Sequence, residues 1–228
     1  FFCRAMRDCG LLDLSSGEPF ASLFTQGMVV HETYKSAAGQ WLLPEETDVK
    51  DGARIELASG KPVAVGAIEK MSKSKKNVVD LDAFIKDFGA DVARWFVLSD
   101  SPPERDVEWT SGGVKGAWNF VQRVWTLVAA QGQPAPKQNE PPPPGADQGA
   151  ALALRQQAHR AIQAVTEDIE HFRFNVAVAR SYELVNAIAK LKSDDEASVF
   201  ARGEALRILA QLISPFMPHL AEESWEKL

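Results

Sequence analysis

The stretch GVKGAWNFVQRVWTLVAA, residues 113–130, contains the clearest structural signal in the chain. Its apolar residues recur at intervals of four and three, the period of an amphipathic α-helix; they are Val114, Trp118, Val121, Trp125 and Val128. The stretch therefore predicts one long helix with an apolar stripe along one side.

Further helices are predicted on the C-terminal side of this stretch. Apolar residues at helical spacing mark a second helix at Ala158, Ile162, Val165 and Ile169, a third at Phe174, Val178, Tyr182, Val185 and Ala189, and a fourth at Leu206, Leu209 and Ile213. A fifth begins in PFMPHLAEESWEKL, where Pro218 suits a first helical turn. Long helices joined by short loops predict an antiparallel bundle.

One long connection interrupts this series. QGQPAPKQNEPPPPGADQG, residues 131–149, is rich in proline and has few apolar residues apart from Pro and Ala. Such a composition favours an extended, semi-rigid linker outside the core. We expect a broad protease to cut there first.

On the N-terminal side, shorter elements are predicted. FFCRAMRDCG reads as a helix that stops at Gly10, LFTQGMVV as a strand, and ARIELA with KPVAVGAI as a β-hairpin that turns near Gly60. Asp80 is a suitable N-cap for the helix LDAFIKDF, which Gly89 should end. Because the chain opens on two phenylalanines without a polar lead, we expect it to be a fragment of a longer protein.

Composition narrows the class of protein. The chain has 228 residues, 45% of them hydrophobic and 25% charged, with a net charge of −6, which is typical of a globular domain and argues against a general coating for nucleic acid. Its two cysteines provide neither a disulfide framework nor a zinc site with four ligands. Without an apolar run of about 18 residues or a signal peptide, we expect a cytoplasmic protein that does not enter membranes.

A focused site for a polyanion is predicted in IEKMSKSKKNVVD, residues 68–80, which concentrates four lysines in seven positions of this acidic chain. Ammonium groups attract phosphate, serine hydroxyls and backbone N–H groups donate to it, and the following helix start favours anions. A solvated loop is the alternative for an ordinary lysine run, but the order Lys-Met-Ser-Lys-Ser is too specific for that interpretation to be favoured.

These letters resemble the KMSKS signature of the class I aminoacyl-tRNA synthetases. The chain is most similar to the leucyl family in PFASLFTQGMVV, KMSKSKKNVVD, FGADVARWFVL, SPPERDVEWTSGGVKGAWNFVQRVW, FNVAVARSYELVNAI and LISPFMPHLAEESW. KMSKS and Gly89-Ala90-Asp91 are shared with the isoleucyl, valyl and methionyl relatives. The segments Thr25–Val29 and Pro-Pro-Glu…Glu-Trp favour the leucyl family.

The resemblance implies a mainly α fold: a helical bundle of the anticodon-binding type, preceded by a small α/β remnant of the catalytic fold and a stem-contact region. The implied domains are 1–68, the end of the nucleotide-binding fold; 69–110, the KMSKS loop and stem-contact region; and 111–228, the tRNA-binding bundle with its linker 131–149. The longer parent would be a leucine–tRNA ligase. The other signature of the class I synthetases, His-x-Gly-His, is absent from this sequence, so we expect the chain alone to be inactive.

The resemblance also implies the ligands and their contacts. ATP with Mg²⁺, leucine and leucine tRNA are the expected ligands of a monomeric parent enzyme, and the leucine pocket would lie mostly outside this chain. Lys70 and Lys73 are the predicted catalytic residues, and Lys73, Ser72 and Ser74 the predicted contacts to the ATP phosphates, although the serines could instead hold the shape of the loop. No metal ligand is predicted.

A basic surface for tRNA is predicted from exposed positions on three helices: Lys115, Arg123, Arg155, Arg173 and Arg180. Solvated helix faces look alike, so the interpretation depends on the set as a whole. Two other functions stay open from sequence: a helical RNA-binding module without catalysis, and an isoleucyl, valyl or methionyl relative.

Overall fold

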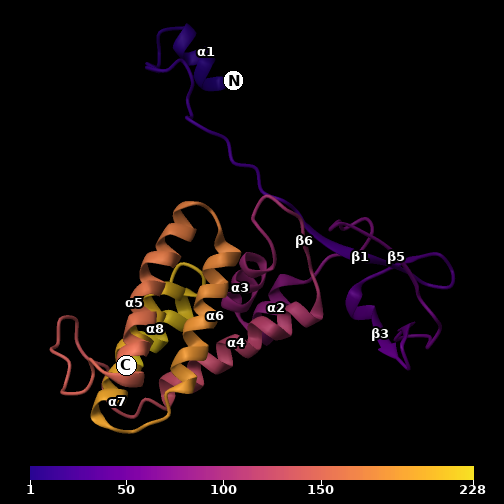
Figure 1. Cartoon of the computed structure of the whole chain (residues 1–228). Helices are drawn as coiled ribbons and strands as arrows, with labels where there is room; N and C mark the ends of the chain where they lie inside the picture. Colours follow the sequence, from indigo (N-terminus) through magenta and orange to yellow (C-terminus); the bar gives the residue numbers. More distant parts are fainter.

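The computed structural model describes all 228 residues. Figure 1 shows a bundle of long helices, a small sheet region to one side, and an N-terminal arm that leads away from both. The elements in chain order are α1 (Phe2–Asp8), β1 (Val29–Lys35), β2 (Trp41–Leu42), η1 (Pro44–Glu46), β3 (Thr47–Lys50), β4 (Ala53–Glu56), β5 (Ala64–Lys70), α2 (Leu81–Phe88), α3 (Ala90–Asp100), β6 (Val107–Glu108), α4 (Ser111–Ala129), α5 (Gly149–Glu170), α6 (Phe174–Lys190), α7 (Glu196–Ile213) and α8 (Pro218–Lys227).

The predicted long helix is confirmed as α4, but its buried face is displaced from the predicted stripe. Trp125 is 39% exposed, and Trp118 and Val121 are half-buried. The side chains that α4 buries are Val114, Ala117, Phe120, Val124 and Val128. The neighbours of α4, helices α3, α6 and α8, surround the face that contains Phe120 and leave the large indole of Trp125 at its edge.

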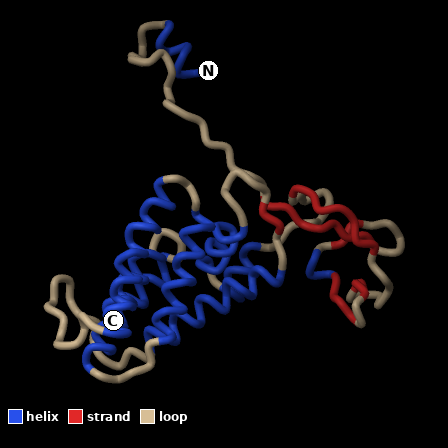
Figure 2. Tube along the Cα trace, viewed as in Figure 1, coloured by secondary structure: helices blue, strands red, loops and turns tan.

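The mainly α fold and the helical bundle are confirmed. Helices α5, α6, α7 and α8 stand where the sequence predicts them, and Figure 2 shows them side by side, with a long loop projecting from the bundle. One core of 31 buried residues joins them to α3 and α4. At its centre, the fully buried Trp95 of α3 stacks on Phe120 of α4 with 4.3 Å between ring centroids, and Phe216 meets its ring edge-on.

The 69–110 and 111–228 regions share this core. Trp95 and Phe96, from the first region, are buried among residues of the second. Asp91 forms a further link, because its carboxylate accepts the Leu220 N–H at the start of α8 at 2.8 Å. The boundary near residue 110 is therefore a division by expected role, and it does not separate two packed cores.

The sheet pairs its strands differently from the predicted hairpin. The segment ARIELA forms β4, which pairs with β3 through a turn at Asp51-Gly52, whereas β5 pairs antiparallel with β1. The chain does turn at Gly60, but the two predicted hairpin arms are joined only by the bridge between Ile55 and Pro62 and the backbone hydrogen bonds around it. The prediction was wrong here because strand partners are chosen by tertiary packing as well as by sequence proximity.

Strand β1 also begins later than predicted, at Val29 instead of Leu23. The residues just before it pair with the loop that leads into β6: Gly27 donates to the Pro103 carbonyl at 2.8 Å. A Cβ on Gly27 would lie 2.0 Å from the Arg105 carbonyl oxygen, so only glycine fits. The two segments that favour the leucyl family by resemblance are thus in direct contact.

The proline-rich segment 131–149 contributes no residue to the core of 31 residues, but it is not a free linker, because it is held at both ends. Ala135 and Ala146 are buried, the Ala135 N–H donates to the Leu228 carbonyl at 2.7 Å, and Gln131 donates to the Val199 carbonyl at 3.1 Å. Between these anchors the chain loops outward (Figure 1). Alanine suits these buried positions because its side chain is small and, unlike proline, it has a backbone N–H to donate.

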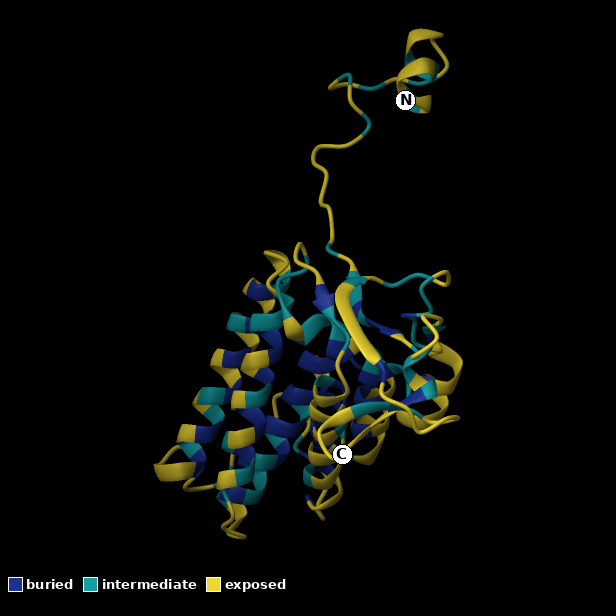
Figure 3. Ribbon diagram, turned by 90° about the vertical axis from the view of Figure 1, so that its right-hand side faces the viewer, coloured by how far each residue is buried: buried dark blue, intermediate teal, exposed yellow.

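The N-terminal helix is confirmed as α1, but it buries no residue. Figure 3 shows the arm as an exposed extension above the sheet and the bundle. Phe24 anchors the arm, because its ring stacks on Phe172 at the turn between α5 and α6 with 4.8 Å between centroids. No helix in the chain is both long and apolar enough to cross a membrane.

Candidate functional site

The lysine-rich segment lies between a strand and a helix start. Strand β5 ends at Lys70, and α2 begins after Asp80, whose carboxylate accepts the N–H groups of Asp82 and Ala83 as predicted. Gly89 ends α2 with a φ of +86°, a conformation that favours glycine. The loop is therefore fixed at both ends by regular structure.

Asn77 anchors the loop from within. Its side chain is fully buried, its Oδ1 accepts the Ser72 N–H at 2.9 Å, and its Nδ2 lies 3.2–3.3 Å from three carbonyl oxygens. These belong to His31, Glu69 and Lys70, at the end of the β1–β5 ladder. The amide satisfies backbone groups where the two strands separate, so Ser72 stays in place while the next residues project outward.

The four lysines differ in their partners. Lys75 forms an ion pair with Glu69, and Lys76 lies 3.5 Å from a carboxylate oxygen of Glu46. Lys70 and Lys73 are exposed and take part in no ion pair. These two predicted catalytic residues are thus the ammonium groups of the loop that remain available to an anion.

The serines and methionine of the signature have distinct surroundings. Ser74 is exposed, and its hydroxyl donates to that of Ser72 at 3.4 Å, so both readings of the serines, phosphate donor or loop support, stay open. Met71 is half-buried and lines an apolar cavity of about 540 Å³ with Val79, Leu98 and Trp109. The loop therefore lies on an apolar support.

Three titratable groups have shifted pKa values. Burial, and next the hydrogen bond that it donates to Glu32, raise the pKa of Tyr34 to about 12, so this phenol stays protonated. Hydrogen bonds from Ser193 and Ser198 lower the pKa of Asp195, the N-cap of α7, to about 2. Both groups have structural roles.

The third shifted group affects the predicted tRNA surface. Glu204 of α7 accepts from Arg155 at 2.7 Å and contacts His159 at 3.2 Å. Burial acts to raise the pKa of Glu204, but the hydrogen bonds from these two residues outweigh it and hold the pKa below its usual value. Arg155 is therefore mostly buried in an internal ion pair.

Arg173 and Arg180 also have a carboxylate partner, the buried Asp168, at 2.9 Å and 3.9 Å. Asp168 lies thirteen residues after Arg155 on α5, or about 20 Å along the helix axis. Lys115 and Arg123 are on α4, where they are exposed and in no ion pair. The five predicted residues thus form separate groups, and two of the five are unpaired.

Two residues that support these regions were not predicted as functional. Asn77 lies three residues after the signature, and an asparagine at the end of a lysine-rich loop is a signal for a side chain that bonds backbone groups. Asp91 was noted only as part of a shared triplet. No cluster of three His, Cys, Asp or Glu side chains that could hold a metal ion occurs in the chain.

Comparisons with known proteins match this chain to parts of tRNA ligases. Residues 152–228 match the "Anticodon-binding domain of tRNA ligase", and residues 64–123 match "tRNA synthetases class I (M)". The whole chain is 60% identical to a leucine–tRNA ligase of Maricaulis maris and 59% identical to one of Hyphomonas neptunium, and it spans 26% of each.

A solved structure supports the same relationship. The ternary complex of the Agrobacterium radiobacter K84 agnB2 LeuRS with tRNA and LeuAMS aligns over 99% of this chain and 25% of its own, with a TM-score of 0.69 and 25% identity. A methionyl-tRNA synthetase of Mycobacterium tuberculosis aligns over 86% of this chain with a TM-score of 0.52 and 13% identity, which supports the fold alone. The chain thus spans about a quarter of the relatives that it matches over its full length.

Proposed function

We propose that this chain, which belongs as a segment to the leucyl-tRNA synthetase family, provides the phosphate-binding loop and a tRNA-binding helical bundle to an enzyme that attaches leucine to leucine tRNA. The observation that carries the proposal is the state of Lys70 and Lys73. Both are exposed and unpaired on a loop whose base is fixed by the buried Asn77.

The chemistry requires positioned positive charge more than proton transfer. The leucine carboxylate attacks the α-phosphate of ATP, the bond to the β-phosphate breaks, and pyrophosphate leaves with the added negative charge. The leucyl group of the adenylate then passes to a hydroxyl at the 3′ end of tRNA, which releases AMP. Mg²⁺ arrives with ATP as part of the substrate.

Lys73 and Lys70 act on the leaving pyrophosphate in this scheme. Ammonium groups that face developing charge stabilise the transition state more than the ground state. The ion pair of Lys75 with Glu69 braces the loop instead, because that lysine already has a carboxylate partner. The hydroxyls of Ser72 and Ser74 either donate to phosphate as well or hold the shape of the loop through the bond between them.

The test uses the complete ligase that carries this segment. Lys73→Ala should lower kcat for leucine-dependent exchange between ATP and pyrophosphate by about 10² while KM for leucine changes little. Lys75→Ala is the matched control and should have a much smaller effect. Equal losses in the two variants, or an unchanged kcat for Lys73→Ala, would contradict the proposed role. If the wild type binds tRNA but shows no catalysis, a non-catalytic RNA-binding module would be favoured.

We also propose that the bundle contacts the tRNA backbone, with Lys115 and Arg123 as the primary contacts. Arg155, Arg173 and Arg180 would contribute less, because each must share its charge with a carboxylate of the fold. Affinity for tRNA should fall steeply with salt and should differ little between leucine tRNA and a control tRNA. Fluorescence anisotropy at several salt concentrations measures both. We propose that the enzyme acts as a monomer in the cytoplasm.

A further inference from the structure

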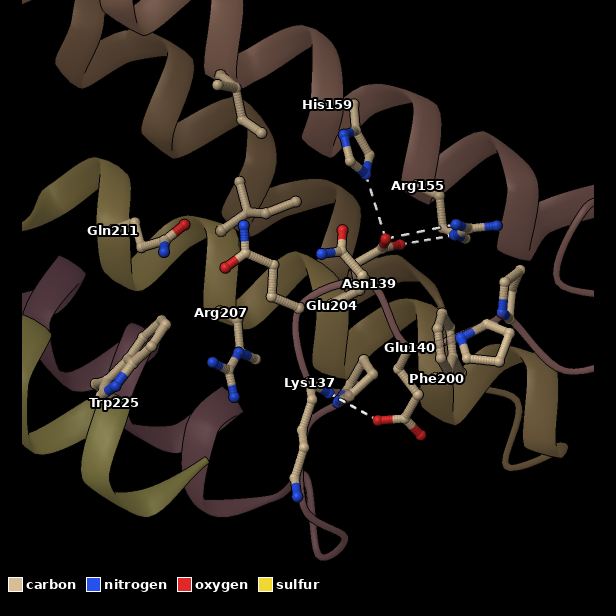
Figure 4. Close-up of a pocket in the computed structure, with 16 residues that line it drawn as sticks. Lys137, Asn139, Glu140, Arg155, His159, Phe200, Glu204, Arg207, Gln211 and Trp225 are labelled. Atoms are coloured by element: carbon tan, nitrogen blue, oxygen red, sulfur yellow. Dashed lines mark hydrogen bonds and ion pairs between the residues drawn. The ribbon is translucent and has the colours of Figure 1, made fainter.

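A cavity of about 660 Å³ opens between the proline-rich segment and helices α5, α7 and α8 (Figure 4). This volume is typical of sites for small ligands. Residues 136–142 form one wall, and helical side chains form the others. The lysines of the KMSKS loop do not line this cavity, and neither do Lys115 and Arg123.

The acidic side chains of this cavity are already engaged. Glu204 holds Arg155 and His159, as described above, and the Glu140 carboxylate accepts the backbone N–H of Lys137 at 2.7 Å. Figure 4 shows both sets of contacts on the cavity wall. Glu204 is thus paired with Arg155 and His159, Glu140 is held by a backbone N–H, and neither carboxylate forms an ion pair with another cation of the cavity.

Two cations of the cavity are in this unpaired state. Lys137 and Arg207 take part in none of the ion pairs of the chain. The Arg207 guanidinium lies over Trp225 at 4.1 Å from the ring centroid, and Trp225 is 40% exposed. In Figure 4, Arg207 lies between the Trp225 ring and the Lys137 chain. The cavity therefore presents a flat, positively charged stacking surface beside the exposed Lys137.

We propose that this cavity binds a nucleotide, with its phosphate against Lys137 and Arg207 and its base stacked on the Arg207–Trp225 pair. Guanidinium planes and aromatic rings both stack on bases with little regard to base identity, and cations hold the phosphate. Gln211 and Asn139 also line the cavity and supply amide donors and acceptors for a base edge. An acidic peptide could occupy the cations but would leave the stacking surface unused.

This inference rests on the proposal that the bundle binds RNA, and the nucleotide can be an unpaired nucleotide of that RNA or a free one. The first experiment follows the indole N–H signal of Trp225 in the NMR spectrum of the full chain, assigned with Trp225→Leu, during titration with AMP, UMP, adenosine, inorganic phosphate and hexaglutamate. AMP and UMP should both move the signal and bind at least tenfold tighter than phosphate or hexaglutamate. No shift, or equal binding of hexaglutamate, would overturn the proposal.

The second experiment identifies the source of the nucleotide. Arg207→Gln and Trp225→Leu should each weaken binding of a labelled single-stranded RNA hexamer about tenfold. Arg105→Gln removes an exposed, unpaired arginine from the loop before β6 and is the matched control, which should change affinity less than twofold. If mononucleotides bind but the variants bind the hexamer and tRNA normally, the site takes free nucleotides. If Arg207→Gln and Arg105→Gln weaken binding equally, the effect is general charge and the site is disproved.

A third measurement separates this inference from the proposed function. Binding of complete tRNA to the wild-type chain reports whether the bundle binds RNA at all. Normal tRNA binding together with an unresponsive Trp225 signal would overturn the cavity assignment and leave the proposed function standing. Absence of tRNA binding together with a nucleotide-responsive Trp225 signal would overturn the proposed function and leave the cavity assignment standing.

Discussion

Replacing Asp91 with alanine is expected to lower the free energy of unfolding by about 3 kcal/mol. The Asp91 side chain is only 10% exposed, and it lies where α3 meets the first turn of α8. Its two oxygens accept from the Leu220 N–H at 2.8 Å and contact the His219 Nδ1 at 2.9 Å. The carboxylate therefore caps a helix that lies far away in the sequence.

The magnitude follows from what the truncation leaves behind. Leu220 is buried, and a buried N–H without an acceptor costs about 1–3 kcal/mol. Loss of a carboxylate from a helix N-terminus adds on the order of 1 kcal/mol. The ion pair with Arg94 contributes less than about 1 kcal/mol, because the Arg94 side chain is 45% exposed.

Urea unfolding followed by circular dichroism measures this change. Asp100→Ala is the matched control, because it removes an exposed carboxylate without a partner from the other end of α3, and it should stay within about 0.5 kcal/mol of the wild type. Asp91→Asn retains an acceptor and should give an intermediate loss. If Asp91→Ala is as stable as Asp100→Ala, the carboxylate does not connect α3 to α8 in solution.

Three further predictions concern other parts of the chain. The pKa of Glu204 is lowered, so its contribution to stability should be complete above the usual carboxylate pKa and lost as the pH falls through the lowered value. Glu204→Gln should remove this part of the acid dependence in unfolding curves recorded between about pH 2 and pH 6. Asn77→Ala should speed hydrogen exchange of the Ser72 amide by about tenfold or more, whereas Lys75→Ala should leave it within about twofold. Limited proteolysis with mass spectrometry should find the first cut within 137–145, between the buried Ala135 and Ala146, and a first cut inside α5 would contradict this.

Much of the local structure could be predicted from the sequence. The apolar spacing of 113–130 predicted α4, and Asp80 and Gly89 marked both ends of α2. These signals depend on residues within one or two helical turns, so they need no knowledge of the rest of the fold. The order of the KMSKS letters also predicted a phosphate-binding loop, and that role stays a prediction.

Partners far apart in the sequence could not be predicted in the same way. The segment ARIELA pairs with β3 instead of β5. Either neighbour would satisfy its alternating pattern, so the sequence could not distinguish between the two partners. The buried face of α4 is set by the helices around it, which leaves Trp125 exposed although it fits the apolar period.

The sequence by itself determined where the helices lie, how α2 is capped, and which loop carries the lysines. Only the tertiary structure decided which cations are available. It places Glu69 and Glu46 against two of the loop lysines, and Glu204 and Asp168 against three of the four predicted arginines. Propensity and capping act through neighbours along the chain, whereas an ion pair requires two side chains within about 4 Å, and only folding brings such distant residues together.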